Sequence, residues 1–184
     1  MGLDMYLTKK VYIGANWEHR NVKGKIEVEA EGKPIKINFN KVSYIDEQTG
    51  YWRKANAIHN WFVKNVQDGE DNCGDYYVSK EKMQELLDLC KKVLENSKLI
   101  DGVIQNGSTF SKDTEPKLIP IWETGKTIEN PEVARELLPV TDGFFFGGTD
   151  YDQYYMEDIE LTIDILEEAL KDKALNEFYY HSSW

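Results

Sequence analysis

The sequence predicts a single α+β domain in which an antiparallel sheet packs against three or four helices. Apolar residues alternate at period two near both ends of the chain, whereas several segments between them repeat at helical spacing. Strands and helices are therefore segregated, which favours an antiparallel sheet over a strictly alternating β/α fold. The chain has 184 residues, and one domain takes roughly 150. We expect one domain over residues 1–184, with an irregular excursion at about 96–130.

The first 45 residues predict strands. Residues 3–7 place Leu3, Met5 and Leu7 on one face of an opening strand. The segments 25–31 and 35–45 alternate in the same way, and the Gly-Lys-Pro sequence between them favours a turn. These two segments predict an antiparallel hairpin.

The remaining elements are mostly helical. The period changes at residue 51, where Ala55, Ile58 and Phe62 begin a single apolar stripe. Ser79 is a suitable N-cap for the next helix, because its side chain can accept from a free backbone N–H. Helices are expected at 51–66, 80–95, 131–138 and 154–171, and a closing strand at 177–184.

Charge is divided unevenly along the chain. Residues 1–66 contain 11 Lys and Arg against 7 Asp and Glu, whereas residues 67–184 contain 11 against 26, and the net charge is −11. Such asymmetry concerns partners more than fold, since the acidic part should repel nucleic acid and attract a basic surface. The alternative is a solvated acidic surface that keeps the protein soluble.

The helix expected at 154–171 has acidic residues opposite its apolar stripe. No Lys or Arg occurs from Glu136 to Leu170, so these acids lack partners at i,i+4 and repel one another. A row of carboxylates resembles a row of phosphates in charge and rough spacing, and a protein that grips nucleic acid could accept it. An ordinary amphipathic helix with its polar side in water is the alternative. The candidate partner-binding residues are Asp150, Asp152, Glu157, Glu160, Asp164, Glu167 and Glu168.

A second group of residues, on the helix 51–66, suggests phosphate chemistry. A metal-free ribonuclease site needs an acid/base beside groups that bind phosphate, and an imidazole titrates near neutral pH. Such catalysis usually needs a second acid/base, which His19 or His181 would supply only if the fold brings it close. The alternative is a hydrogen-bonded helix surface at the edge of the core. The candidates are His59 as the catalytic residue and Arg53, Lys54 and Asn56 as phosphate-binding residues.

The sequence predicts no metal and no cofactor. Cys73 and Cys90, with three scattered histidines, match no zinc spacing, and the acidic loop 67–75 lacks the spacing of a calcium loop. The two cysteines also make no disulfide framework, which is typical of a reducing compartment. No apolar run approaches the roughly 18 residues of a membrane span. We therefore expect a cytoplasmic protein with no membrane segment.

Four segments resemble a family of small acidic proteins encoded by phages and prophages of Gram-positive bacteria. They are MGLDMYL (1–7), YWRKANAIHNWF (51–62), LLPVTDGFFFGGTDYDQYY (137–155) and FYYHSSW (178–184). The resemblance covers most of the chain and is weak over 96–130. In size and charge the chain is also similar to type II anti-CRISPR proteins, which bind the effector nuclease or disturb its guide RNA. The resemblance supplies no catalytic residues.

The resemblance implies a phage-type counter-defence protein acting in the host cell cytoplasm. It would be an anti-CRISPR inhibitor whose acidic helix binds a basic host protein, the type II CRISPR effector nuclease, and blocks its guide RNA or DNA. Contact with guide RNA would be indirect. The alternative is a metal-independent ribonuclease or nucleotide-hydrolysing enzyme acting on guide RNA or on a defence signal. A third possibility is a protein that sequesters such a signal, although a net charge of −11 counts against it.

Overall fold

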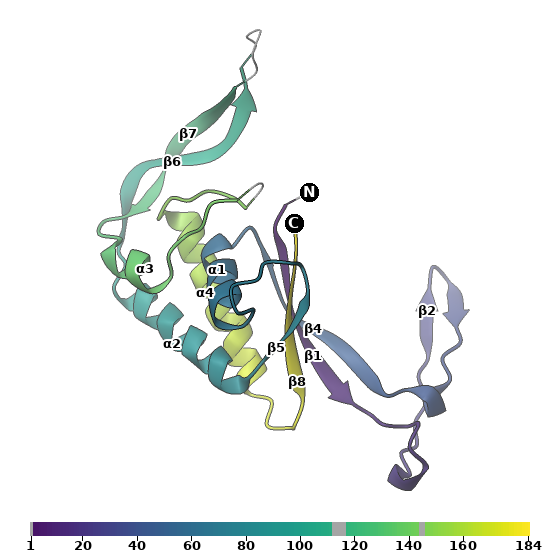
Figure 1. The fold of residues 1–184 in the computed structure, drawn as a ribbon. Coiled ribbons are helices and arrows are strands. Elements are labelled where there is room, and N and C mark those ends of the chain that lie inside the picture. The colour runs from purple at the N-terminus through teal and green to yellow at the C-terminus, as the bar shows by residue number, and fades with distance from the viewer. Residues whose placement is uncertain (1, 112–116, 144–145) are drawn as a thin grey trace.

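A four-stranded antiparallel sheet is the centre of the molecule. The computed structural model describes residues 2–111, 117–143 and 146–184 (Figure 1). The strands lie in the order β4-β1-β8-β5, and every pairing is antiparallel. They are β1 (Asp4–Tyr12), β4 (Tyr44–Arg53), β8 (Glu177–Ser183) and β5 (Asp75–Val78). The predicted α+β class with an antiparallel sheet is confirmed.

Helices cover one face of this sheet, as Figure 1 shows. They are α1 (Asn56–Asn65), α2 (Lys80–Glu95), the short α3 (Glu132–Leu137) and α4 (Gln153–Leu170). Ser79 caps α2 as predicted, because its Oγ accepts from the backbone N–H of Lys82 at 3.2 Å. The helices therefore begin and end close to the expected residues, except α1.

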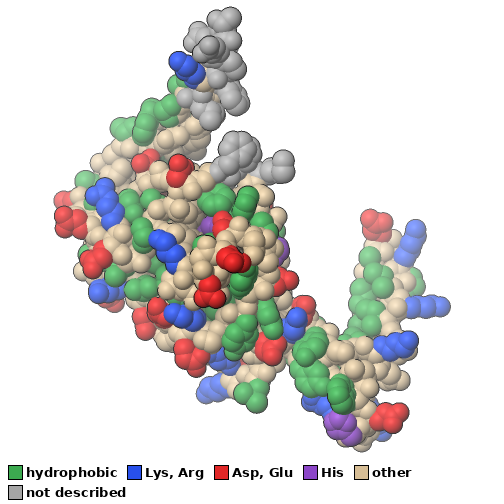
Figure 2. Space-filling view, viewed as in Figure 1, with side chains coloured by type: hydrophobic (Ala, Val, Ile, Leu, Met, Phe, Trp, Pro, Cys, Tyr) green, Lys and Arg blue, Asp and Glu red, His purple; other side chains and the backbone are tan. Residues whose placement is uncertain are grey.

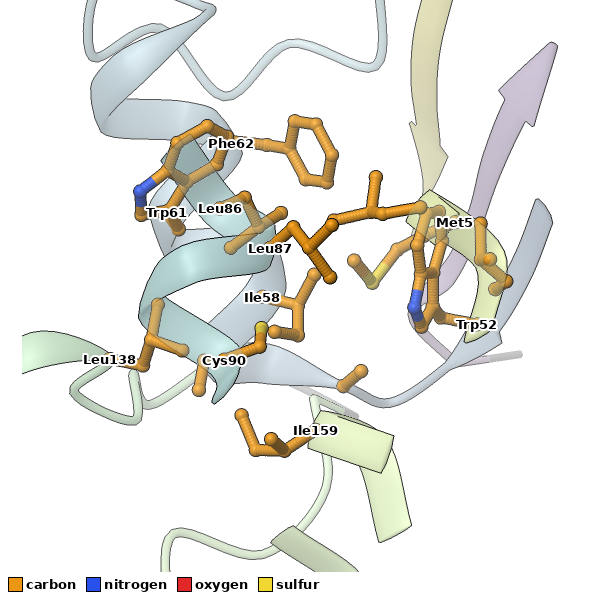
Figure 3. Packing of buried hydrophobic residues seen from close by; sticks show 14 of the residues in the cluster. Met5, Trp52, Ile58, Trp61, Phe62, Leu86, Leu87, Cys90, Leu138 and Ile159 are labelled. Atoms are coloured by element: carbon orange, nitrogen blue, oxygen red, sulfur yellow. The ribbon is translucent and has the colours of Figure 1, made fainter. Parts of the chain in front are cut away.

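The core lies between the sheet and the helices. Leu3, Met5 and Leu7 point inward from β1 and its approach, and all three are fully buried. In Figure 3, Met5 and Trp52 from the sheet point toward the interior that Ile58, Leu86, Cys90 and Ile159 reach from α1, α2 and α4. Each fully buried side chain of this size stabilises the fold by about 1.5–3 kcal/mol.

Helix α1 begins five residues later than the sequence predicts. Tyr51, Trp52 and Arg53 continue β4 and pair with residues 4–6 of β1. Lys54 then takes a φ of 62°, which turns the chain out of the strand before α1 begins at Asn56. Strand pairing with a distant segment thus overrides the local helical pattern.

The described part of the excursion at 96–130 is mostly paired as strands, which corrects the prediction of an irregular segment. It forms a long hairpin of β6 (Leu99–Phe110) and β7 (Leu118–Ile128). A shift in register between Gln105 and Ser108 marks an irregularity in the hairpin. Figure 1 shows this hairpin projecting from the end of the helical layer.

The hairpin predicted for 25–45 is much shorter than expected. Its strands are β2 (Val28–Ala30) and β3 (Lys33–Ile35), and the 3₁₀ turns η1 (Glu18–Arg20) and η2 (Phe39–Lys41) flank it. No side chain of β2 or β3 is buried. Among the described residues, no helix has the length and apolar character needed to cross a membrane.

Candidate functional site

Helix α4 is held against the sheet by its apolar side. The indole Nε1 of Trp52 donates to Thr162 Oγ1 at 2.9 Å, and both residues are buried. A Cβ added at Gly50 would lie 2.5 Å from Ile165 Cγ2, so the glycine allows β4 and α4 to approach closely. The opposite side of α4 is therefore directed away from the sheet.

Three predicted acids on that side carry no ion pair. Glu157, Glu160 and Asp164 are exposed, and within the described residues no Lys, Arg or His nitrogen forms an ion pair with them. Leu161 lies among them and is 41% exposed. We call Glu157, Glu160, Leu161 and Asp164 the acidic surface. It combines uncompensated negative charge with one exposed apolar side chain.

Two further predicted acids are neutralised within the molecule. Glu167 Oε1 lies 2.6 Å from Lys91 Nζ of α2, and Glu168 Oε2 lies 2.7 Å from Lys171 Nζ. The hydrogen bond from Lys91 lowers the pKa of Glu167, which keeps that carboxylate ionised. The prediction that the acids of this helix lack basic partners is therefore wrong at its C-terminal end.

Asp152 is a structural cap and not an exposed contact. It is 5% exposed, and its Oδ1 accepts from the backbone N–H groups of Tyr154 and Tyr155. Burial raises the pKa of Asp152 against the lowering effect of these hydrogen bonds. Its neighbour Asp150 remains exposed and lines a hollow of about 570 Å³ beside Trp122. Only Asp150 of this pair can meet a partner directly.

Asp158 is the acid on α4 that the sequence interpretation missed. It lies beside the buried stripe and is only partly exposed. Burial, followed by the charges of Glu157 and Asp152, raises its pKa to about 7. A partly buried carboxyl that titrates near neutral pH makes the charge of α4 depend on pH.

His59 is a buried member of a hydrogen-bonded chain. It is 1% exposed, with Nε2 3.0 Å from Asp71 Oδ2 and Nδ1 2.7 Å from Tyr180 Oη. Because a carboxylate only accepts, the Nε2 N–H donates to Asp71, and Nδ1 shares a hydrogen bond with the tyrosine hydroxyl. The other Asp71 oxygen accepts from Trp184 Nε1 at 3.0 Å. Both nitrogens of the predicted catalytic residue are engaged in holding the loop 67–75 and strand β8.

Asn56 is likewise used by the fold. Its Nδ2 donates to the carbonyl oxygens of Phe146 and Gly148, and its Oδ1 accepts from the backbone N–H of Thr141. The side chain is 4% exposed. It ties the connection before α4 to α1, and the prediction that it binds phosphate conflicts with its burial.

The predicted phosphate-binding cations do not meet His59. Arg53 is exposed and alternates with the buried Trp52 along β4, so it lies on the open face of the sheet. His59 lies on the helical side. Lys54 is exposed at the strand-to-helix junction, against Gly147. The fold separates the components of the predicted phosphate site.

Cys90 is a core residue and is not available for catalysis. Burial raises the pKa of Cys90 to about 12, so its thiol stays protonated in the core. Cys73 lies in the loop 67–75, where it takes a φ of 54°. Within the part of the chain that the structure describes, no three His, Cys, Asp or Glu side chains are arranged to hold a metal ion.

Comparisons with protein-family models, with curated proteins and with solved structures found no match to this chain. The resemblance to phage-encoded proteins therefore stays a prediction. The acidic surface of α4 is the candidate site that the geometry favours, because its polar groups are not used by the fold.

Proposed function

We propose that this protein is a binding inhibitor whose acidic surface on α4 docks on a basic, nucleic-acid-binding surface of a host protein. The observation that supports the proposal is the set of three exposed and unpaired carboxylates around Leu161. An ordinary solvated helix face commonly carries lysines beside its acids, and here the sequence has none from Glu136 to Leu170.

The spacing of the carboxylates suits a groove that binds a phosphate chain. Glu157, Glu160 and Asp164 follow one another at about 4.5 and 6 Å of rise along the helix axis. Lysines and arginines that bind phosphates would meet negative charge at comparable intervals. Long-range attraction would speed association and make it sensitive to salt, while Leu161 supplies an apolar contact at the centre.

The partner class that we propose to test first is a type II CRISPR effector nuclease, with its guide RNA or DNA channel as the blocked surface. This choice comes from the resemblance of the chain to phage proteins. The alternative enzymatic function has less support, since His59 is buried and Arg53 lies on the other side of the sheet.

The test is inhibition of DNA cleavage by a purified type II effector nuclease, with and without Glu160→Lys combined with Asp164→Lys. The wild-type protein is expected to bind and inhibit at low salt and to weaken as salt rises. The double reversal should weaken binding by about tenfold or more, because attraction at two positions becomes repulsion.

A matched control separates local from global charge effects. Asp88→Lys combined with Glu95→Lys makes the same change in net charge at two exposed positions of α2, which are seven residues apart where Glu160 and Asp164 are four apart. This control should retain inhibition. An equal loss of inhibition in both double variants would reject the acidic surface as the contact. Absence of binding by the wild-type protein would reject this partner class.

A further inference from the structure

Residues 13–43 form an arm that is inserted between two neighbouring strands. Tyr12 at the end of β1 pairs with Tyr44 at the start of β4. The backbone N–H groups of Ile13 and Gly14 both donate to the carbonyl of Ser43, at 2.9 and 3.0 Å. The arm therefore leaves and re-enters the body at one point, and Figure 1 shows it extending away from the main sheet.

The arm makes almost no core of its own. Of its 31 residues, only Gly14 is buried. Trp17 is 52% exposed and Ile35 is 49% exposed, with Val28 and Ile37 also open to solvent. A two-stranded hairpin alone in water is only marginally stable, and it normally needs a further apolar surface to cover it.

One side of the hairpin combines apolar groups with one lysine. Val28 faces Ile35 across the ladder, and Ala30 faces Lys33 beside them, so these four side chains share one face. Figure 2 shows hydrophobic side chains together with several Lys and Arg over the arm. This face has the composition of an interface that lacks its partner.

The charge of the arm is opposite to that of the rest of the chain. Residues 13–43 contain 6 Lys and Arg against 4 Asp and Glu, whereas the remaining residues contain 16 against 29. The acidic surface of α4 is an exposed surface of complementary charge that the molecule itself provides. Within one chain the acidic surface and the arm project from different parts of the fold. The acidic surface that meets an arm would therefore belong to a second copy of the chain.

We propose that the arm of one copy docks on the acidic surface of a second copy, and that the second arm returns the contact to form a two-fold symmetric dimer. Lys33 would face Glu160 and Asp164 of the other copy, while Val28 and Ile35, on the same face of the hairpin, would cover Leu161 of that copy. The inference goes beyond the proposed function, and the two contacts compete for the same acidic surface, so a dimer would have to dissociate before that surface met a host protein.

Charge exchange between the two surfaces gives the sharpest test. One variant carries Lys33→Glu, and the other carries Glu160→Lys and Asp164→Lys. Each variant alone should dimerise at least about tenfold more weakly than the wild-type chain, because like charges then meet at both contacts. Mixed together they should form heterodimers of wild-type strength, since both contacts become attractive again. Sedimentation velocity with one variant fluorescently labelled measures all three cases.

A deletion supplies an independent measurement. Replacing residues 14–42 by an Asn-Gly turn joins β1 to β4 as a simple hairpin. The one buried residue that this deletion removes is Gly14, which has no side chain. The shortened chain should fold with unchanged thermal stability at low concentration and remain monomeric. Circular dichroism and sedimentation check the two outcomes separately.

The inference is overturned if the wild-type chain is monomeric at every concentration reached in low-salt buffer. It is also overturned if the shortened chain dimerises as strongly as the full chain, or if mixing the charge variants yields no heterodimer. None of these measurements involves a nuclease, so their failure would leave the proposed function standing. Failure of nuclease inhibition with heterodimers intact would reject the proposed function and retain the dimer.

Discussion

Helices α1 and α4 both carry polar residues that suggest function, but the fold treats the two sets differently. On α1, His59 and Asn56 are buried, and each makes hydrogen bonds to segments far away in the sequence. On α4, Glu160 and Asp164 are exposed and form no ion pair with any described residue.

The difference shows how to separate structural from functional polar groups. A buried polar group must be paired, because leaving it unpaired costs about 1–3 kcal/mol. An exposed acid beside other acids gains nothing from the fold and is slightly repelled by its neighbours. The polar groups of α1 are therefore explained by stability, whereas those of α4 still require an explanation.

The largest effect on stability is expected at His59. His59→Ala should lower the free energy of unfolding by about 3 kcal/mol, because it leaves a cavity and removes the partners of Tyr180 and Asp71. Urea denaturation measures the change. Lys64→Ala, at an exposed position of the same helix, is the control and should change stability by less than about 0.5 kcal/mol. Similar values for the two variants would contradict a structural role for His59 and revive the catalytic hypothesis.

An intermediate effect is expected at Asp158, and it depends on pH. The pKa of this carboxyl is about 7 in the folded protein, compared with an ordinary value of 3.8. A raised pKa means that the folded state holds the proton more tightly, so this stabilisation is complete below about pH 4 and is lost as pH rises through 7. Asp158→Asn should remove that loss.

At pH 8 we expect Asp158→Asn to stabilise the protein by about 2 kcal/mol. This value is smaller than the pKa shift alone would give, because the side chain is partly exposed to solvent. At pH 4 the variant and the wild-type protein should be nearly equal. Thermal unfolding across this pH range gives the comparison. A constant difference at every pH would show that the carboxyl does not titrate in the expected window.

The smallest effect on stability is expected at the acidic surface. Glu160→Gln combined with Asp164→Asn should change the free energy of unfolding by less than about 0.5 kcal/mol, with a slight gain from lost repulsion. The same pair should weaken partner binding. Differential scanning calorimetry measures the change in stability. A decrease of more than about 2 kcal/mol in the free energy of unfolding would show that these acids stabilise α4.

Elements with their own local signals could be predicted from the sequence. Helix α2 has a cap at Ser79 and an apolar stripe, and both are present in the structure. The acids of α4 were also placed on its exposed side. The catalytic interpretation of His59 missed its burial, whereas the alternative of a hydrogen-bonded residue at the edge of the core is close to the structure. Its position four residues after Ala55 and three before Phe62 puts it on the apolar stripe. Asp152 had a signal too, since an acid directly before a helix is a common N-cap.

Elements that depend on distant pairing could not be predicted in the same way. Tyr51 to Arg53 belong to β4 only because β1 pairs with them. The hairpin β6–β7 lacks a clear alternation, in part because Gly102 and Gly125 face each other in the ladder and contribute no side chain to the pattern. The burial of Asp158 depends on how closely α4 packs, which the sequence alone does not specify.

The hydrogen-bonded junction of Ile13 with Ser43 should allow the arm to be replaced by another segment. Backbone hydrogen bonds join the two ends of the arm at this point, and the core of the main sheet and helices does not include the arm. A reporter domain inserted there, in place of residues 14–42, should therefore fold independently of the body. The same junction would let evolution replace one recognition segment with another without repacking a single helix.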